Sequence, residues 1–190
     1  GARRVVLAGN SLGGWIAWRF AVIHPNQVQR LLLVDAAGYP FNSQSVPIGF
    51  RVARIPVLNR LVQRLLPRSV VEVSVRNVFG DPHKVTATLV DRYFDLTRRA
   101  GNRTALVARF SQPKSDPDTT SIRTITTPTL ILWGGRDRLI PPDNAARFGR
   151  DIPGSRVVMF EALGHVPHEE NPAVTVAAVR EFLARVVPPT

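Results

Sequence analysis

The chain has 190 residues, of which 44% are hydrophobic, a length and composition that suffice for one domain with a core and exclude disordered or collagen-like chains. It contains no Cys, which excludes a disulfide scaffold and Cys-based metal or nucleophile chemistry, and no apolar run approaches the roughly 20 residues of a membrane-spanning helix. The net charge of +11 comes mostly from Arg residues spread over many segments without a nucleic-acid-binding motif, so we interpret it as solvated surface and expect no nucleic-acid partner.

A strand, a tight turn and a helix are predicted at the beginning of the chain. Residues 5–8 are all apolar, which favours a strand buried on both faces of a parallel sheet. Gly9 and Gly13 flank Ser11 at the spacing Gly-x-Ser-x-Gly, which is typical of a nucleophile elbow, a strained turn that raises a Ser hydroxyl above the end of a sheet. We expect a Cβ on either glycine to collide where strand and helix pass each other. The helix is predicted to end near Ile23.

Other glycine-rich turns fit this stretch less well. A P-loop would need Gly-Lys-Ser/Thr, and the first Lys of the chain is Lys84. A dinucleotide fingerprint would need Gly-x-Gly-x-x-Gly, which is absent here. The remaining alternative is that Ser11 is only a small turn residue, and the rest of the chain must decide between the two.

The second strand is predicted at residues 30–37. Strand, helix and strand within roughly 35 residues form a βαβ unit, which implies a parallel sheet. The strand contains Asp35 near its end. The sheet is predicted to resume at residues 128–135, directly before Asp137, and the last strand at 155–161.

Between these strands, residues 41–123 show no buried-strand pattern. Helical spacing of apolar residues predicts helices over 58–66, from 69, over 85–97 and through 106–110. Ser69 and Glu72 have the spacing of a capping box, and Gly101 has the place of a C-terminal cap. We expect residues 41–123 to form a helical cap inserted into a core made of residues 1–40 and 124–190.

Three chemically active residues each follow a predicted strand: Ser11, Asp137 and His165. Loops at the carboxyl ends of parallel strands gather on one side of the sheet, where ligands bind. Ser attacks a carbonyl once a base has taken its proton, His is that base, and Asp fixes the imidazole tautomer. The order Ser, Asp, His is that of elbow-type hydrolases. Asp35 and His168 are competing positions for the acid and the base, and we expect both to be structural.

Four segments resemble the α/β-hydrolase superfamily, in particular its capped esterases, lipases and meta-cleavage product hydrolases: Gly-Asn-Ser-Leu-Gly-Gly at 9–14, Leu-Val-Asp-Ala-Ala-Gly at 33–38, Leu-Ile-Leu-Trp-Gly-Gly-Arg-Asp at 130–137 and Gly-His-Val-Pro at 164–167. The resemblance implies an α/β fold with a parallel sheet, flanking helices and an inserted cap. It also implies that the backbone N–H of Leu12 is one oxyanion-hole donor, and that no cofactor or metal is needed. A Ser at the elbow argues against the branches with an Asp nucleophile.

The resemblance also implies strands before the elbow strand and a loop that gives the second oxyanion donor. Since the chain begins at the elbow strand, we expect a fragment that lacks the N-terminal strands and is inactive alone. A signal peptide would lie in that missing part, so the localisation is not predicted.

The expected function is hydrolysis of a small apolar carboxylic ester through an acyl-enzyme. Two alternatives stay open: hydrolysis of a carbon–carbon bond, as in meta-cleavage product hydrolases, and a catalytically silent hydrolase-fold module that binds a partner through its basic cap. Neither the substrate nor the oligomeric state is predicted.

Overall fold

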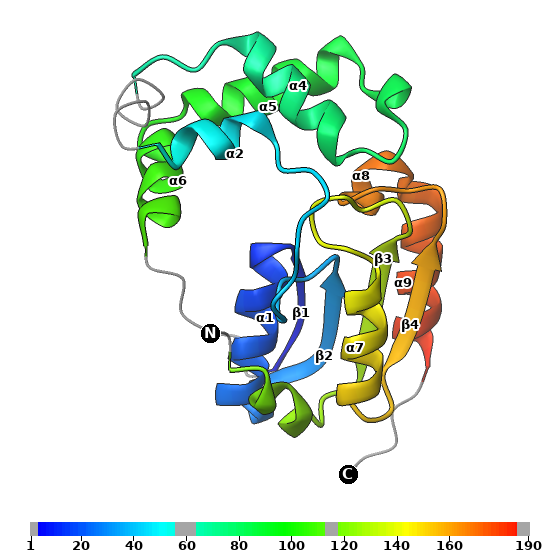
Figure 1. Cartoon of the computed structure of the whole chain (residues 1–190). Coiled ribbons are helices and arrows are strands. Elements are labelled where there is room, and N and C mark those ends of the chain that lie inside the picture. Colours follow the sequence, from blue (N-terminus) through cyan, green and yellow to red (C-terminus); the bar gives the residue numbers. More distant parts are fainter. Residues whose placement is uncertain (1–3, 56–63, 113–117, 186–190) are drawn as a thin grey trace.

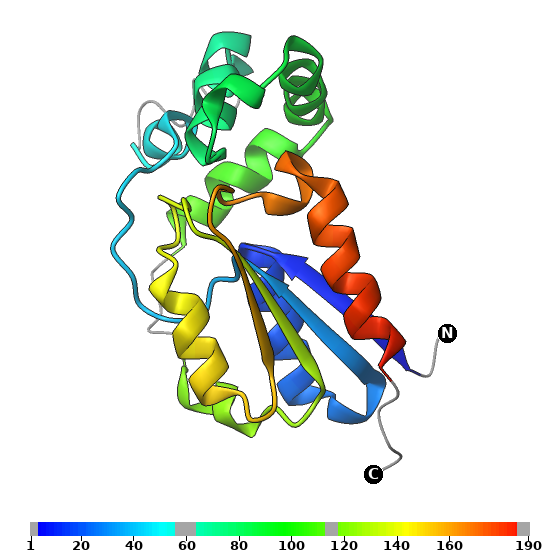
Figure 2. The same ribbon diagram turned by 90° about the vertical axis from the view of Figure 1, so that its right-hand side faces the viewer.

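The computed structural model describes residues 4–55, 64–112 and 118–185 of the chain (Figure 1). A sheet with helices on both faces forms one part of the molecule, and a group of helices lies beyond one end of the sheet (Figure 1, Figure 2). The helix expected over 58–66 falls mostly outside the described residues.

The sheet is parallel, with strand order β1-β2-β3-β4. Its strands are β1 (Val5–Asn10), β2 (Val28–Val34), β3 (Thr129–Gly134) and β4 (Arg156–Phe160). This confirms the predicted α/β fold. Because the strands run in one direction, the turns that follow them lie along the same edge of the sheet.

Alternate residues of the central strands face opposite layers, as the two-residue period of a strand requires. Helices α1 (Leu12–Ile23) and α7 (Asp143–Asp151) cover one face, where they pack on the odd-numbered members Leu31, Leu33, Ile131 and Trp133. Helix α9 (Pro172–Ala184) covers the other face, where Phe182 packs with Leu32 and Leu130. Asn171 caps α9 by accepting from the Val174 N–H.

Strand β1 lies at the edge of the described sheet and pairs only with β2 there. The expectation that residues 5–8 are buried on both faces is therefore wrong for the described part of the chain. Leu7 packs against the core under α1, but Val6 is 46% exposed on the opposite face, because α9 lies over β3 rather than over β1. Helix α1 also exposes large apolar side chains, at Trp15, Ile16 and Ile23.

The helices beyond the sheet are α2 (Ile48–Ala53), α4 (Arg68–Val78), α5 (Ala87–Arg98) and α6 (Asn102–Ser111), with a short 3₁₀ turn, η2 (Pro82–Lys84), between α4 and α5. Helices α2, α4 and α5 contribute to an apolar cluster that includes Val71, Val75, Phe79 and Val90, and α6 contacts α2 through the rings of Phe110 and Phe50. All of them lie at the carboxyl end of the strands (Figure 1). In contrast, a second 3₁₀ turn, η3 (Thr120–Thr124), places Ile122 in the core under α1, although the cap was expected to extend to residue 123.

Two local predictions in this region are wrong. Ser69 caps no helix, because α4 already begins at Arg68 after Pro67, and Glu72 instead pairs with Arg68 and Arg76 at 3.4 and 3.0 Å. Gly101 has the expected positive φ of 84°, but it stands directly before α6 rather than ending α5, whose C-terminal cap is Arg99. Among the described helices, none has the length and apolar character to cross a membrane.

Candidate active site

Ser11 lies at the apex of the turn between β1 and α1, in a strained conformation. Its φ of 54° and ψ of −118° place a non-glycine residue at positive φ, which costs about 1–3 kcal/mol and persists only where the surroundings enforce it. The Ser11 N–H donates to the Val34 carbonyl at 3.0 Å, and its own carbonyl accepts from the Ala37 N–H at 3.0 Å. The chain following β2 therefore holds the candidate nucleophile on both sides.

Close backbone approach at this turn involves Gly9 and Gly14. A Cβ on Gly9 would lie 2.1 Å from the carbonyl oxygen of Gly13, as expected. Gly13 itself has open space at that position, so the expectation of a collision there is wrong. The second glycine required is Gly14, where a Cβ would come within 2.4 Å of the Ala36 side chain. The helix thus meets the chain after β2 one residue later than the sequence pattern suggested.

Asp137 and His165 form a buried hydrogen-bonded pair. His165 Nδ1 lies 2.7 Å from Asp137 Oδ2, and both side chains are inaccessible to solvent or nearly so. The other carboxylate oxygen, Oδ1, accepts from the N–H groups of Leu139 and Ile140 at 2.8 and 3.0 Å. Both oxygens of Asp137 are therefore occupied, and a carboxylate held in this way keeps the proton of a neutral imidazole on Nδ1.

Asn10 connects this pair to the turn that carries Ser11. Its side-chain Nδ2 donates to the carbonyls of Val34 and His165, at 3.1 and 3.0 Å. The three expected residues thus lie at the same edge of the sheet. In the described part of the chain, no hydrogen bond joins the Ser11 hydroxyl to the His165 ring; such contacts are often loose in ligand-free hydrolases.

Asp35 belongs to the same cluster, although the sequence analysis set it aside. It is completely buried, has a positive φ of 43°, and accepts the Gly134 N–H on Oδ1 at 2.9 Å. Its Oδ2 is buried and has no hydrogen-bond partner among the described residues. Burial, and next the negative charge of Asp137, raise the pKa of Asp35 well above its usual range. Both causes disfavour the charged form of the Asp35 carboxyl.

One ligand atom from each of Asp35, Asp137 and His165 lies within 4.8 Å of the others, a spacing that a metal site could also have. The donors fit a metal poorly, because both Asp137 oxygens are already committed to His165 and to two backbone amides. The hydrogen-bonded pair explains the geometry more simply.

The remaining predicted residues are Leu12 and His168. Leu12 is the first residue of α1, so its N–H has no acceptor within the helix and lies at the positive end of the helix dipole, as an oxyanion donor must. His168 lies in the short helix α8 (Pro167–Glu170), where burial lowers the pKa of its imidazole. No carboxylate hydrogen-bonds its ring in the described structure, unlike that of His165.

Two residues of this site, Asn10 and Glu170, were not predicted from the sequence. Asn10 directly precedes Ser11 in the Gly-x-Ser-x-Gly motif, and this position between the strand and the candidate nucleophile could have indicated its role. Glu170 accepts three backbone N–H groups around the His165 loop, and nothing in the local pattern distinguishes it from a solvated helix residue.

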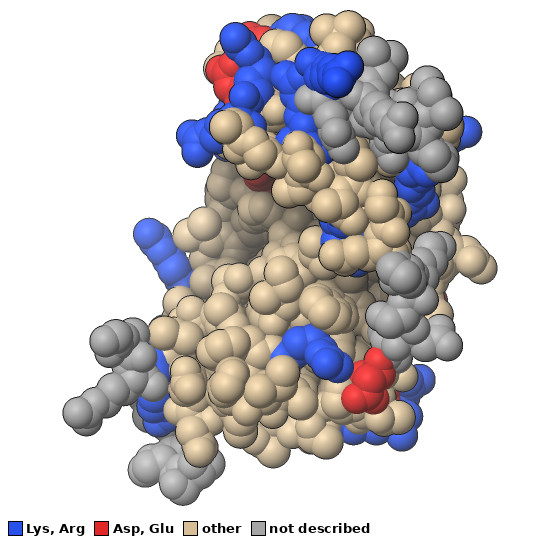
Figure 3. Space-filling model, turned by 90° about the vertical axis from the view of Figure 1, so that its left-hand side faces the viewer, with Lys and Arg blue, Asp and Glu red and all other residues tan. Residues whose placement is uncertain are grey.

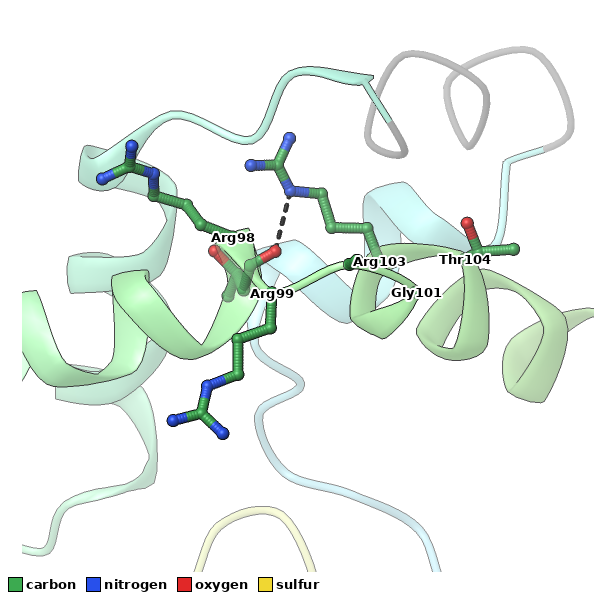
Figure 4. A pocket seen from close by; sticks show the side chains of 7 residues that line it. Arg98, Arg99, Gly101, Arg103 and Thr104 are labelled. Carbon is green, nitrogen blue, oxygen red and sulfur yellow. Dashed lines mark hydrogen bonds between the residues drawn. The ribbon is translucent and has the colours of Figure 1, made fainter.

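A separate pocket of about 250 Å³ lies at the turn between α5 and α6 (Figure 4). It is lined by residues 97–101, 103 and 104. Two of its three arginines already have partners: Arg103 Nε donates to the Thr97 carbonyl at 2.9 Å, and Arg98 lies 3.6 Å from Asp95. The pocket contains none of the candidate catalytic residues.

A parallel sheet that presents a Ser on a strained turn and an Asp–His pair at the same edge is the arrangement found in hydrolases of the α/β class. The chain belongs to the alpha/beta hydrolase family, whose family model matches residues 1–179. This confirms the resemblance recognised in the sequence.

Relatives within the family differ in the reactions that their names state. The 2-hydroxy-6-oxononadienedioate/2-hydroxy-6-oxononatrienedioate hydrolase of Cupriavidus pinatubonensis is 31% identical over 185 residues, which cover 95% of this chain and 62% of the relative. Lipase 1 of Psychrobacter immobilis is 26% identical, over 89% of this chain and 52% of the lipase. A solved meta-cleavage product hydrolase from Pseudomonas fluorescens has a TM-score of 0.79 at 22% identity, over 96% of this chain and 65% of that one, and shares the fold. The chain thus spans about half to two thirds of the length of these relatives.

Proposed function

We propose that a protein containing this chain is a serine hydrolase that cleaves carboxylic esters of apolar acyl groups. Ser11 Oγ attacks the ester carbonyl while His165 Nε2 takes its proton, and Asp137 holds the imidazole in the required tautomer. The Leu12 N–H donates to the oxyanion that forms. His165 then protonates the departing alcohol, and it activates the water that hydrolyses the acyl-enzyme.

The observation that carries this proposal is the 2.7 Å hydrogen bond between His165 Nδ1 and Asp137 Oδ2. It leaves Nε2 as the basic nitrogen of the ring. Asn10, which directly precedes Ser11, donates a hydrogen bond to the backbone carbonyl of that His. Exposed apolar side chains beside Ser11, at Leu12 and Trp15, favour an apolar acyl group, as does the similarity to a protein named as a lipase.

Hydrolysis of a carbon–carbon bond is the second candidate, favoured by the relative named as a dienedioate hydrolase and by the Gly-Asn-Ser elbow. The two reactions are separated by assaying the full-length protein on p-nitrophenyl esters of increasing acyl length and on 2-hydroxy-6-oxo-dienoates. Ester turnover at least tenfold more efficient than dienoate turnover supports the first proposal, and the reverse ranking supports the second. A protein that an active-site fluorophosphonate does not label is a silent binding module.

We further propose that helices α2, α4, α5 and α6 form a cap that selects substrates without taking part in the chemistry. The cap contains one His, His83, which is exposed in η2 and makes no side-chain hydrogen bond to another described residue. We expect His83→Ala in the full-length protein to change kcat less than about twofold and to act, if at all, on KM. His165→Ala is the matched comparison. Equal losses of kcat in both variants would contradict a cap without chemistry.

The exposed edge predicts how residues 1–190 behave when expressed alone. In the described part of the chain, strand β1 is paired on one side only, with Val6 exposed beside the free edge, and α1 presents Trp15, Ile16 and Ile23. Such edges and apolar patches favour association between copies. We expect residues 1–190 to elute as a mixture of oligomers in size-exclusion chromatography with light scattering and to lack ester turnover. A monodisperse active monomer would contradict this prediction. Ile16→Lys with Ile23→Lys should reduce the association, and Lys substitutions at exposed Val174 and Val176 of α9 are the control.

A further inference from the structure

Glu170 is a buried carboxylate that binds backbone groups from two separate segments. Its side chain is completely inaccessible to solvent. Oε2 accepts from the N–H groups of Gly80 and Gly164, both at 2.9 Å, and Oε1 accepts from the Asp81 N–H at 2.9 Å. The nearest cation is Lys84, whose Nζ lies 4.0 Å from Oε1. Three N–H donors and one ammonium group thus stabilise the buried charge.

The two segments belong to different parts of the fold. Gly164 directly precedes His165, whereas Gly80 and Asp81 belong to the cap, in the turn between α4 and η2. A single oxygen, Oε2, therefore joins the cap to the loop that carries the proposed base. The His165 N–H adds a direct bond to the Val78 carbonyl, at 2.8 Å.

Close packing reinforces this junction. A Cβ on Gly80 would come within 2.6 Å of the Ala162 carbonyl oxygen, and one on Gly164 would come within 2.4 Å of the Gly80 nitrogen. The turn and the loop are in backbone contact, so neither moves far without displacing the other. Arg138, next to Asp137 in sequence, extends the contact by donating to the carbonyls of Asn77 and Phe79 at 3.0 and 3.3 Å.

Within residues 4–55, 64–112 and 118–185, the hydrogen bonds between the cap helices and the sheet part lie on this side of the molecule. Glu169 adds contacts with Arg92 and with Tyr93, whose hydroxyl donates at 3.0 Å. Helix α6, by contrast, makes no hydrogen bond or ion pair with the sheet part within the described ranges. Seen from the α6 side, the surface is hollowed between cap and sheet part (Figure 3). Within the described residues, the cap is thus anchored over His165.

We propose that Glu170 is a positioning residue that fixes the His165 loop to the cap. The base is correctly placed only while the turn at residues 78–81 keeps its hydrogen bonds to Glu170 and to the His165 N–H. The inference rests on the proposed function of His165. It also gives the cap a fixed end at Glu170.

The test is Glu170→Gln in the full-length protein. A Gln amide has one acceptor oxygen, and its NH₂ group cannot accept, so at least one of the three N–H groups loses its partner in either orientation. Because displacement of a catalytic group by about 1 Å costs on the order of 10²-fold, we expect kcat for a short activated ester to fall roughly 10- to 100-fold with KM changed less than about twofold. Amide exchange at Gly80 and Gly164 should accelerate at the same time.

Glu169→Gln is the matched control, because Glu169 also joins α8 to the cap but contacts only Arg92 and Tyr93 there. It should retain kcat within about twofold. If Glu170→Gln only lowers the melting temperature and leaves kcat unchanged well below it, Glu170 is structural and the proposal is wrong. Should Glu170→Gln fail to fold, Glu170→Asp, whose shorter side chain cannot reach both Gly80 and Gly164, takes its place with the same expected loss and the same contradicting outcome. Fluorophosphonate labelling of the wild type separates the two proposals. If the wild type is not labelled, the proposed hydrolase function is wrong, whereas amide exchange at Gly80 and Gly164 still tests whether Glu170 fixes the His165 loop to the cap.

Discussion

Replacing Ser11 by Ala should abolish covalent labelling of the full-length protein by a fluorophosphonate and reduce kcat for ester hydrolysis by about 10⁶, the loss measured when the nucleophile of a serine protease triad is removed. The physical reason is that the turn at Ser11 holds its hydroxyl at the carboxyl edge of the sheet, beside the Asn10 link to His165. Ala loses the nucleophile and keeps the backbone bonds to Val34 and Ala37, so the fold should persist.

The matched control is Ser69→Ala, since Ser69 is exposed on α4 and caps nothing. Its labelling and turnover should equal those of the wild type. Melting curves of both variants separate loss of chemistry from loss of fold. Labelling that persists in Ser11→Ala, mapped to another Ser by mass spectrometry, would remove Ser11 from the mechanism.

Asp137→Asn should reduce kcat by about 10⁴, whereas Asp35→Asn should leave it within about tenfold of the wild type. An Asn at 137 places an amide against His165 Nδ1 or against the amides of Leu139 and Ile140, so the imidazole is held in the wrong tautomer. Asp35 differs because burial and the neighbouring charge of Asp137 raise the pKa of its carboxyl and so favour the protonated form. An Asn there can still accept the Gly134 N–H and offer a donor in place of the acid proton.

Both variants are measured at the same pH on the same short ester, with labelling as a second readout. Asp35→Leu is the complementary control: it leaves the Gly134 N–H without a partner and should lower stability as well as activity. If Asp35→Asn proves as damaging as Asp137→Asn, the cluster acts as a coupled pair of acids. A larger loss at Asp35 would assign the orienting role to the second strand.

The sequence located the candidate Ser, Asp and His because each follows an apolar run that forms a strand, and strand ends in a parallel sheet share an edge. That inference needs only local patterns and their order. The involvement of Asp35 could not be inferred in the same way. Its position after β2 was visible, but its burial beside Asp137 depends on the pairing of β2 with β3 across the whole insertion.

Other errors have the same origin. The choice between Gly13 and Gly14 as the crowded glycine depends on how α1 rotates over Ala36, which the Gly-x-Ser-x-Gly spacing does not encode. Ser69 and Glu72 matched a capping pattern, yet α4 begins at Arg68, directly after Pro67 and one residue before Ser69. Glu170 was missed because its partners come from residues about 90 positions away in the chain and from the loop just before it.

The insertion of helices α2, α4, α5 and α6 between β2 and β3 has a consequence for how such chains change over time. The register of the two parallel strands pairs Leu31 with Thr129, so the distance between the two ends of the intervening chain is fixed whatever its length. Doubling the length of a flexible connection costs only about 0.6 kcal/mol in closure entropy. Recombination could therefore lengthen, shorten or exchange the helices between them without unfolding the sheet, provided that the replacement still supplies a turn that fits the buried carboxylate of Glu170.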